Sequence, residues 1–366
     1  MKKRLFVMSH GLASVGIDIF VVNIATHFDR EKFDVSVVLA LDEGGAKQPR
    51  EDEVRSAGIP IRYTCDLGSV KRIVTHFLRL YRILRKEQVD IFHSNMGLMD
   101  GINCMAALLA GVPVRVTHSH TTDSHYAAKT GRQLIAAVFR WAMRLLCTLT
   151  ANRRCGCSEP AMVYMFGENW KKKRHTCVIN NGIDLQRFRP DGAKTQNDTK
   201  RIISVGRLAN EKNPLFALDV MAELRKLRQD FVYEWVGTGE MREQVAAAIR
   251  EKGLEAYVRL LGARNDIEKL LPQRDLFFMP SKFEGLWIAL IEAQAAGLPC
   301  VGSDQIPELA NCGGCTFLPL DAAASDWAKA ISDILDGKHS LSVDPEKLHK
   351  FDIGYTVEQL EQVYNG

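Results

Sequence analysis

Short apolar runs alternate with longer amphipathic segments along most of the chain, and this alternation limits the possible folds more than any other feature. The first series of apolar runs occupies residues 4–9, 34–41, 59–64, 89–94 and 112–119. The runs are continuous rather than alternately polar, as expected of strands that are buried on both faces. Between them lie segments such as 71–87, in which apolar residues recur at helical spacing. Strands that alternate with helices predict an α/β fold with a parallel, doubly wound sheet.

The pattern stops and then restarts, which predicts two domains. A polar stretch at 190–200 precedes a second series of apolar runs, at 201–206, 231–237, 258–262, 275–281 and 299–303. A chain of 366 residues is also too long for one ordinary core. We therefore expect two doubly wound domains facing each other across a cleft, with boundaries at 1–182 and 183–345 and a final amphipathic segment at 346–366.

Charge is unevenly distributed along the chain. Residues 1–180 contain 26 Lys and Arg against 16 Asp and Glu, whereas the remainder contains 22 against 28. A basic half favours an anionic partner such as phosphate, a membrane surface or nucleic acid, although an ordinary solvated surface is the plainer alternative. Nine cysteines without paired spacing favour a reducing, cytoplasmic compartment. No apolar run reaches the roughly 18 residues typical of a membrane span.

Two cations follow the first strand of the second series. Ligands of open α/β sheets bind beyond the carboxyl ends of the strands, and Arg207 and Lys212 occupy such a position. They suit a diphosphate, because Arg offers a planar fork and Lys a compact charge, but two surface cations would give the same sequence. Gly239 follows the next strand and indicates a tight turn that a ligand can approach. The third glycine of a dinucleotide fingerprint is absent, because Arg242 occupies its place.

A third turn carries two carboxylates, Glu284 and Glu292, which are eight positions apart. If a helix begins near Leu286, its free backbone amides would suit phosphate. Glu284 then stands outside the helix start, and Glu292 lies several ångströms further on, at roughly 1.5 Å per residue. This separation suits two hydroxyl-bearing parts of one long ligand, which predicts a nucleotide-sugar site. A helix cap and a solvated helix carboxylate remain the alternative.

In the first half, glycines and histidines follow the predicted strands. Gly16 allows a close approach of the backbone near a helix start. His118 and His120 end the run at 112–119, where a histidine can act as a base or a hydrogen-bond donor, or can simply be a satisfied loop residue. No Asp-x-Asp occurs, and this His-x-His lacks a partner cluster, so we expect no metal site.

Several of these stretches together resemble a known family. EGLWIALIEAQAAGLPCVGSDQIPE (284–308), VGRLANEKNP (205–214) and VINNGIDLQRF (178–188) are similar to the large family of retaining glycosyltransferases with the GT-B fold. VDIFHSNMG and VRVTHSHT resemble its bacterial capsule and exopolysaccharide branch. The resemblance covers nearly the whole chain, and its most specific part is the Glu-x7-Glu spacing. It implies metal-independent transfer of a hexose from a UDP- or GDP-sugar, without a cofactor, and a last helix that crosses back to the first domain.

The resemblance also implies a role for each matching residue. Arg207 and Lys212 match the pair that neutralises the donor diphosphate. Glu284 matches the acid facing the transferred sugar, and Glu292 the acid that binds the ribose. Further donor contacts fall on Gly16, Gly285, Leu286 and Trp287, to which the turn at Gly239 is added. The family commonly has two adjacent glycines where this chain has Val15 and Gly16.

The first domain is expected to bind the acceptor. His120, or alternatively His118, matches the histidine of the family's cleft, and we expect acceptor contacts from His93, Asn95, His118 and His120. Catalytic roles are assigned to His120, Arg207, Lys212 and Glu284. The acceptor is expected to be a saccharide, free or linked to polyprenyl diphosphate.

Basic residues of the first domain suggest where the enzyme works. They cluster at 71–86 and 132–154, which favours peripheral contact of a cytoplasmic enzyme with the anionic inner face of the plasma membrane. We expect no nucleic-acid partner.

Two other functions stay open at this point. A nucleotide-sugar epimerase or hydrolase shares the GT-B architecture but would turn over the donor without an acceptor. An NAD-dependent oxidoreductase would need the glycine-rich fingerprint that is missing here.

Overall fold

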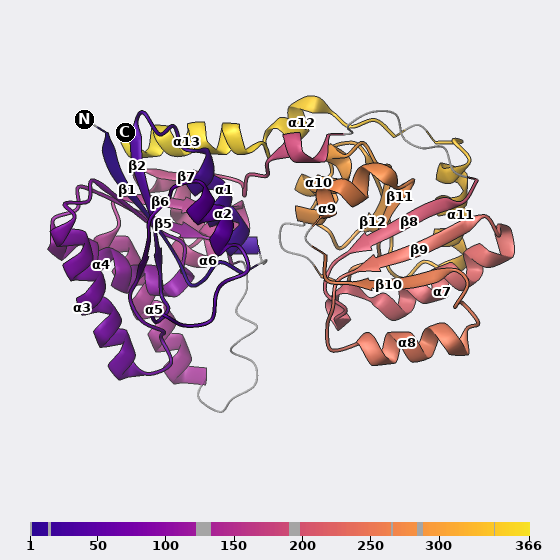
Figure 1. Ribbon diagram of the computed structural model, residues 1–366, viewed down its shortest axis with the longest axis horizontal. Coiled ribbons are helices and arrows are strands. Elements are labelled where there is room, and N and C mark those ends of the chain that lie inside the picture. Colours follow the sequence, from indigo (N-terminus) through magenta and orange to yellow (C-terminus); the bar gives the residue numbers. More distant parts are fainter. Residues whose placement is uncertain are drawn as a thin grey trace. The chain divides into compact units, whose positions relative to one another are not determined.

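The computed structural model describes residues 2–13, 16–121, 133–189, 198–264, 266–283, 288–339 and 341–366. The chain divides into two compact units (Figure 1). Unit 1 contains Met1–Ile183 and Asp352–Gly366, and unit 2 contains Asp184–Phe351.

Unit 1 contains a seven-stranded sheet in the order β3-β2-β1-β4-β5-β6-β7, with every pairing parallel. The strands are β1 (Lys3–Ser9), β2 (Phe33–Leu39), β3 (Ile61–Tyr63), β4 (Ile91–Ser94), β5 (Val114–Ser119), β6 (Arg153–Gly156) and β7 (Thr176–Val178). Because β1 pairs with both β2 and β4, the strand order reverses beside β1. In doubly wound sheets this reversal marks the edge at which ligands bind.

Helices cover both faces of this sheet. They are α1 (Gly16–His27), α2 (Glu51–Ser56), α3 (Val70–Lys86), α4 (Asp100–Ala110), α5 (Gln133–Thr150), α6 (Glu159–Phe166) and α13 (Ile353–Asn365). Residues of α1, α2 and α13 share a core cluster with Leu5 and Val7 of β1, while α3 and α4 share another with Phe6 and Met8. The alternate side chains of one strand thus serve two cores, which explains its uninterrupted apolar sequence.

The last helix, α13, belongs to unit 1. Asp352 caps its start by accepting a hydrogen bond from the Gly354 amide at 2.8 Å. Val357, Leu360 and Tyr364 are buried in the core cluster that contains α1. The Tyr364 hydroxyl also lies 2.7 Å from His93 Nδ1, so the end of the chain is fixed to the middle of the sheet.

Unit 2 contains a six-stranded parallel sheet in the order β10-β9-β8-β11-β12-β13. Its strands are β8 (Lys200–Val205), β9 (Phe231–Val236), β10 (Val258–Gly262), β11 (Leu276–Met279), β12 (Cys300–Ser303) and β13 (Cys315–Leu318). Its helices are α7 (Pro214–Leu227), α8 (Arg242–Glu251), α9 (Ile267–Leu270), α10 (Ile288–Ala295), α11 (Ala324–Leu335) and α12 (Pro345–His349). Pro214 begins α7, where its missing N–H costs no helix hydrogen bond.

The predicted fold class is confirmed, since both units are parallel sheets between helices. Each predicted apolar run is a strand, with ends that differ by no more than two residues. The two series of apolar runs contain no run for β6, β7 or β13. β6 begins with Arg153 and Arg154, and β7 has only three residues, so neither carries the continuous apolar run on which the prediction depended.

A buried ion pair in unit 2 provides a test of this packing. Arg274 Nε lies 2.6 Å from Glu234 Oε2, and the two side chains are only 7% and 8% exposed. We predict that Arg274→Ala lowers the free energy of unfolding by about 3–5 kcal/mol, because it leaves a carboxylate buried without its cation. Urea unfolding followed by the fluorescence of buried Trp235 and Trp327 measures this loss.

The exposed pair between Arg264 and Asp266, also 2.6 Å apart, supplies the control. Arg264→Ala should cost less than about 1 kcal/mol, because water screens exposed charges. Equal losses in both variants would contradict the prediction.

Candidate functional site

The carboxyl ends of β4, β5 and β7 bring three polar side chains together in unit 1. His120 follows β5, Asn95 follows β4 and Asn181 comes shortly after β7. His120 Nδ1 lies 2.9 Å from Asn181 Oδ1, and His120 Nε2 lies 3.0 Å from Asn95 Oδ1. Phe20 of α1 packs against the ring with 4.8 Å between centroids. The imidazole is therefore held from three sides but is still only half-buried.

The hydrogen bonds of Asn95 decide which ring nitrogen of His120 carries the proton. Asn95 Nδ2 donates to the Met8 carbonyl at 3.2 Å, so its Oδ1 faces His120 as an acceptor. A neutral imidazole has one N–H, and we assign it to Nε2. On its other side, the ring presents Nδ1 to the side-chain amide of Asn181, whose Oδ1 lies 2.9 Å away.

His120 is neutral at physiological pH. Burial lowers its pKa to about 4, against the opposing effect of the hydrogen bond to Asn181. A neutral ring with a fixed tautomer can orient a hydroxyl, but a group with this pKa is a weak general base.

His93 and His118 continue the row of rings into the core. Neither is exposed, and His93 Nε2 lies 3.2 Å from His118 Nδ1. His118 Nε2 lies 3.3 Å from the Ile179 carbonyl. Burial lowers the pKa of His93 to about 3 and that of His118 well below its usual value. The acceptor contacts predicted for His93 and His118 stay predictions, and the enclosed positions of the two side chains do not support them.

The loop after β1 is organised by Asp18. Its carboxylate accepts from the Ser9 hydroxyl at 2.7 Å and from the Ala13 amide at 2.9 Å. Gly16 begins α1, and among the described residues no atom outside its chain neighbours and its own helix backbone lies within 4 Å of the place where a Cβ would stand. A ligand can therefore approach its backbone, as the predicted donor contact requires. Val15 lies outside the described residues.

A hollow of about 540 Å³ at the carboxyl ends of β2 and β3 was not predicted from the sequence. Its lining consists of residues 41–48, Glu51 and Arg55 of α2, Tyr63 and Asp66. Glu51 accepts from Arg55 at 2.7 Å and from the Tyr63 hydroxyl at 3.1 Å, and Arg55 is the main cause of its lowered pKa. The hollow is within the range of ligand pockets, and ionised carboxylates beside a phenol suit hydroxyl groups. The polar turn directly after the run at 34–41 was the available signal.

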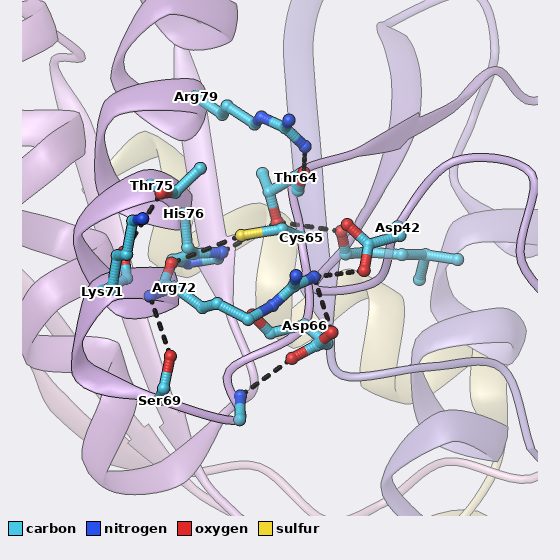
Figure 2. A network of polar contacts seen from close by, with 12 residues as sticks. Asp42, Thr64, Cys65, Asp66, Ser69, Lys71, Arg72, Thr75, His76 and Arg79 are labelled. Carbon is cyan, nitrogen blue, oxygen red and sulfur yellow. Dashed lines mark hydrogen bonds and ion pairs between the residues drawn. The ribbon is translucent and has the colours of Figure 1, made fainter.

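Arg72 of α3 ties two walls of this hollow together. Figure 2 shows its guanidinium between Asp42 and Asp66, the second at 2.5 Å. The Gly68 amide donates to Asp66 and, together with Arg72, lowers the pKa of that carboxyl. Cys65 Sγ donates to the Arg72 carbonyl at 3.3 Å. The loops after β2 and β3 are thus held to the start of α3 rather than left independent.

In unit 2, the two predicted cations flank the turn after β8. Lys212 is half-buried, and its Cε would lie 3.5 Å from a Cβ added to Gly206, so its side chain covers the end of the strand. Arg207 is exposed, and its Nη2 lies 2.6 Å from Glu211 Oε1. That hydrogen bond raises the pKa of Arg207.

Gly239 has a packing role that the sequence did not reveal. A Cβ at this position would stand 2.2 Å from the Leu208 carbonyl oxygen, so only glycine allows the loops after β8 and β9 to meet. The Leu208 amide donates to the Thr238 carbonyl at 2.9 Å across the same contact. The donor contact predicted for Gly239 stays a prediction.

The loop after β11 joins this cluster. The Lys282 amide donates to the Glu211 carbonyl, and Lys282 Nζ donates to Asn210 Oδ1, both at 2.8 Å. Glu284, Gly285, Leu286 and Trp287 come next and lie outside the described residues. Glu292 is half-buried in α10. The loops after β8, β9 and β11 therefore meet at one edge of the sheet, as the predicted diphosphate site requires.

No group of three or more His, Cys, Asp or Glu among the described residues is placed to hold a metal ion. Within the same residues, no helix is long and apolar enough to cross a membrane.

Two family models match the chain, one in each half. Residues 15–187 match "Glycosyltransferase Family 4" and residues 199–337 match "Glycosyl transferases group 1". The putative glycosyltransferase EpsF of Bacillus subtilis is 31% identical over 90% of this chain and 87% of that protein. The Escherichia coli UDP-Gal:alpha-D-GlcNAc-diphosphoundecaprenol alpha-1,3-galactosyltransferase is 30% identical over 75% of this chain and 72% of that protein.

Solved structures are similar over the whole chain. HepE of Anabaena in complex with UDP-glucose has a TM-score of 0.76, with 17% identity and 99% of both chains covered. The lipopolysaccharide glycosyltransferase WaaG has a TM-score of 0.65 at 15% identity, with 99% of this chain and 97% of that chain covered. At these identities the likeness shows the fold, and it agrees with the predicted fold class.

The tautomer assigned to His120 yields a test. We predict that Asn95→Asp raises the pKa of His120 from about 4 by about 1–3 units, because a carboxylate 3 Å from Nε2 favours the imidazolium. Nuclear magnetic resonance titration of the labelled imidazole measures the change. His93, which contacts Tyr364 and His118 instead, is the internal control and should keep its low pKa. An unchanged His120 titration would contradict the assignment.

Proposed function

The chain belongs to the group 1 and family 4 glycosyltransferases, and we propose that it transfers a hexose from a nucleoside-diphosphate sugar to a hydroxyl of a lipid-linked saccharide. The proposed reaction retains the anomeric configuration and needs neither a divalent metal nor a cofactor. The observation that carries the proposal is the meeting of the loops after β8, β9 and β11, which brings Arg207 and Lys212 to the edge of one sheet.

The donor diphosphate is assigned to this edge of unit 2. Charge develops on the diphosphate as the sugar leaves, and Lys212 and Arg207 would stabilise it there without bringing in a metal. Glu211 holds Arg207 in place at 2.6 Å before the donor arrives. Glu292 is proposed to bind the ribose. Glu284 is proposed to face the transferred sugar, with the backbone of residues 285–287 near the phosphates.

The acceptor is assigned to unit 1. His120, rather than the enclosed His118, is proposed to position the reacting hydroxyl through hydrogen bonding. Because its pKa of about 4 makes it a weak base, the proposed mechanism lets the departing phosphate take the hydroxyl proton on the same face of the sugar. This front-face course agrees with retention of configuration.

The hollow beside β2 and β3 is proposed to bind a second sugar of the acceptor. The sheet order places β5, which directly precedes His120, three strands away from β2. At about 4.8 Å between neighbouring strands, the two places are about 15 Å apart, a distance that a short saccharide spans. Asp42, Glu51 and Asp66 would accept hydrogen bonds from its hydroxyls.

The relatives support a role in polysaccharide synthesis. Their names include a galactosyltransferase acting on a diphosphoundecaprenol-linked sugar and the capsular polysaccharide glycosyltransferase CapH of Staphylococcus aureus. We therefore propose a UDP- or GDP-sugar donor, a polyprenyl-diphosphate-linked acceptor in capsule or exopolysaccharide synthesis, and work at the inner face of the plasma membrane. The comparisons do not favour an epimerase, a hydrolase or an oxidoreductase, and donor turnover without acceptor would be the sign of the first two.

The donor site is tested by two substitutions. Lys212→Ala and Glu292→Ala should each weaken donor affinity about 10–100-fold, the cost of a lost hydrogen bond to a charged group. Thermal stabilisation by a panel of UDP- and GDP-sugars identifies the donor in the parent protein, and calorimetry with that donor then measures the loss. Lys226→Ala, which removes an exposed α7 cation paired with Glu223, is the control and should bind normally. Full donor affinity in both site variants would defeat the assignment.

The acceptor hollow is tested by Glu43→Ala. Glu43 lines the hollow and makes no hydrogen bond or ion pair within the described part of the chain. Its loss should raise the KM for a saccharide acceptor about tenfold, with donor affinity unchanged. Glu31→Ala, an exposed carboxylate of unit 1 away from the hollow, is the matched control. An acceptor KM that moves equally in both variants would argue against this subsite.

A further inference from the structure

The outward side of α3, α4 and α5 exposes most of the large apolar side chains that unit 1 shows to solvent. α4 packs against both α3 and α5, so the three helices form one layer beside the sheet (Figure 1). We call their outward side the α3–α5 face. The exposed apolar side chains on it are Val70, Val74, Leu78, Leu108, Leu109, Val138, Phe139, Trp141, Leu145 and Leu149.

These side chains form continuous stripes rather than isolated positions. Val70, Val74 and Leu78 follow one another at four-residue spacing along α3 and are 78%, 54% and 43% exposed. In α5, Trp141, Leu145 and Leu149 repeat the same spacing, and Trp141 is 66% exposed. Residues four apart lie on the same side of a helix. Each of these helices therefore buries one apolar side and presents a second one to solvent.

The charges on this face have a single sign. α3 and α5 contain no Asp or Glu, and the one carboxylate of α4, Asp100, is completely buried. Lys71, Arg82, Arg85 and Lys86 are exposed, and among the described residues their side chains make no ion pair or hydrogen bond. Like charges three and four residues apart repel one another on a helix, as between Arg82 and both Arg85 and Lys86.

Exposed lysines of unit 2 show the contrast. Lys226 on α7 lies 2.7 Å from Glu223, and Lys338 lies 2.8 Å from Asp333. Within the described residues, Lys71, Arg82, Arg85 and Lys86 make no ion pair of this kind, which fits an anionic partner supplied from outside.

Not every basic residue of this region belongs to the face. Arg153 Nε donates to the Val363 carbonyl and Arg154 Nη2 to the Thr148 carbonyl, so both are used within unit 1. Arg132 lies outside the described residues.

We propose that the α3–α5 face docks on an anionic lipid bilayer, with its cations at the headgroups and the side chains of Val74, Leu78 and Trp141 entering the interface. This inference rests on the proposed function, because docking on a bilayer would bring the enzyme to a lipid-linked acceptor. It rests on the apolar stripes and unpaired cations for its evidence. A nucleic acid would use the cations but gains little from exposed Val and Leu side chains, whereas a bilayer interface uses both.

Vesicle flotation of the full-length protein tests the proposal. The probes are phosphatidylcholine vesicles with and without phosphatidylglycerol, at about 0.05 M and about 0.5 M salt. We expect binding to the anionic vesicles at low salt and clear weakening at high salt. Arg82→Glu/Arg85→Glu should weaken that binding at least about 25-fold, because each cation near an anionic surface contributes about fivefold. Trp141→Ser should weaken it about tenfold.

Matched controls lie in unit 2. Arg250→Glu reverses an exposed helical cation on α8, and Leu227→Ser removes a side chain of α7 that is 56% exposed. Both should bind vesicles like the parent protein. Unchanged melting temperatures and unchanged donor-induced stabilisation show that the α3–α5 variants are folded.

Four results would overturn the proposal. They are no flotation of the parent protein with anionic vesicles, equal flotation with neutral ones, equal losses in the control variants, and a dimer in sedimentation that Trp141→Ser converts to a monomer. Sugar transfer to a water-soluble acceptor distinguishes a failure of the docking proposal from a failure of the proposed function. Transfer without vesicle binding refutes only the docking face, and vesicle binding without transfer or donor binding refutes only the enzyme.

Discussion

Parallel pairing of the strands is the constraint on which both units depend. In unit 1, Ser9 at the end of β1 pairs with Leu39 of β2, and the neighbouring Met8 pairs with Ser94 of β4. Because every strand points the same way, the loops that leave the strands gather at one edge, although the sequence separates them by tens of residues. His120 meets Asn95 and Asn181 for this reason, and the turn after β8 meets Lys282 for the same reason in unit 2. The parallel direction of the strands thus brings the polar residues of each site to one edge of its sheet.

The fold could be predicted well because parallel strands that are buried on both faces have a continuous apolar sequence. The run at 4–9 is continuous because helices cover both faces of β1. Prediction failed where a strand is short or polar. Arg153 and Arg154 sit in β6 because their guanidiniums reach backbone carbonyls of Val363 and Thr148, contacts that no local pattern reveals.

The site could be predicted in part, residue by residue. The position of Arg207 and Lys212 after a strand could be predicted because charge after an apolar run is visible in sequence, and the structure places Lys212 over the end of β8. The state of His120 could not be predicted, since it depends on an amide fixed by the carbonyl of Met8, a residue 112 positions away in the chain. Gly239, for which only a ligand contact was predicted, is also required by the close approach of the Leu208 backbone. The hollow beside β2 and β3 was missed because its walls come from three separate segments, and Arg72 joins two of them.

The position of α13 affects how the chain can acquire its structure during synthesis. Val357, Leu360 and Tyr364 belong to the core of unit 1, yet they follow unit 2 in the chain and leave the ribosome after it. Unit 2, whose residues 184–351 are continuous, is fully synthesised earlier. Unit 1 therefore lacks the helix that covers one face of its sheet until after unit 2, which follows it, has been synthesised and can fold. In this protein, the unit whose synthesis begins first is the unit whose sequence is completed second.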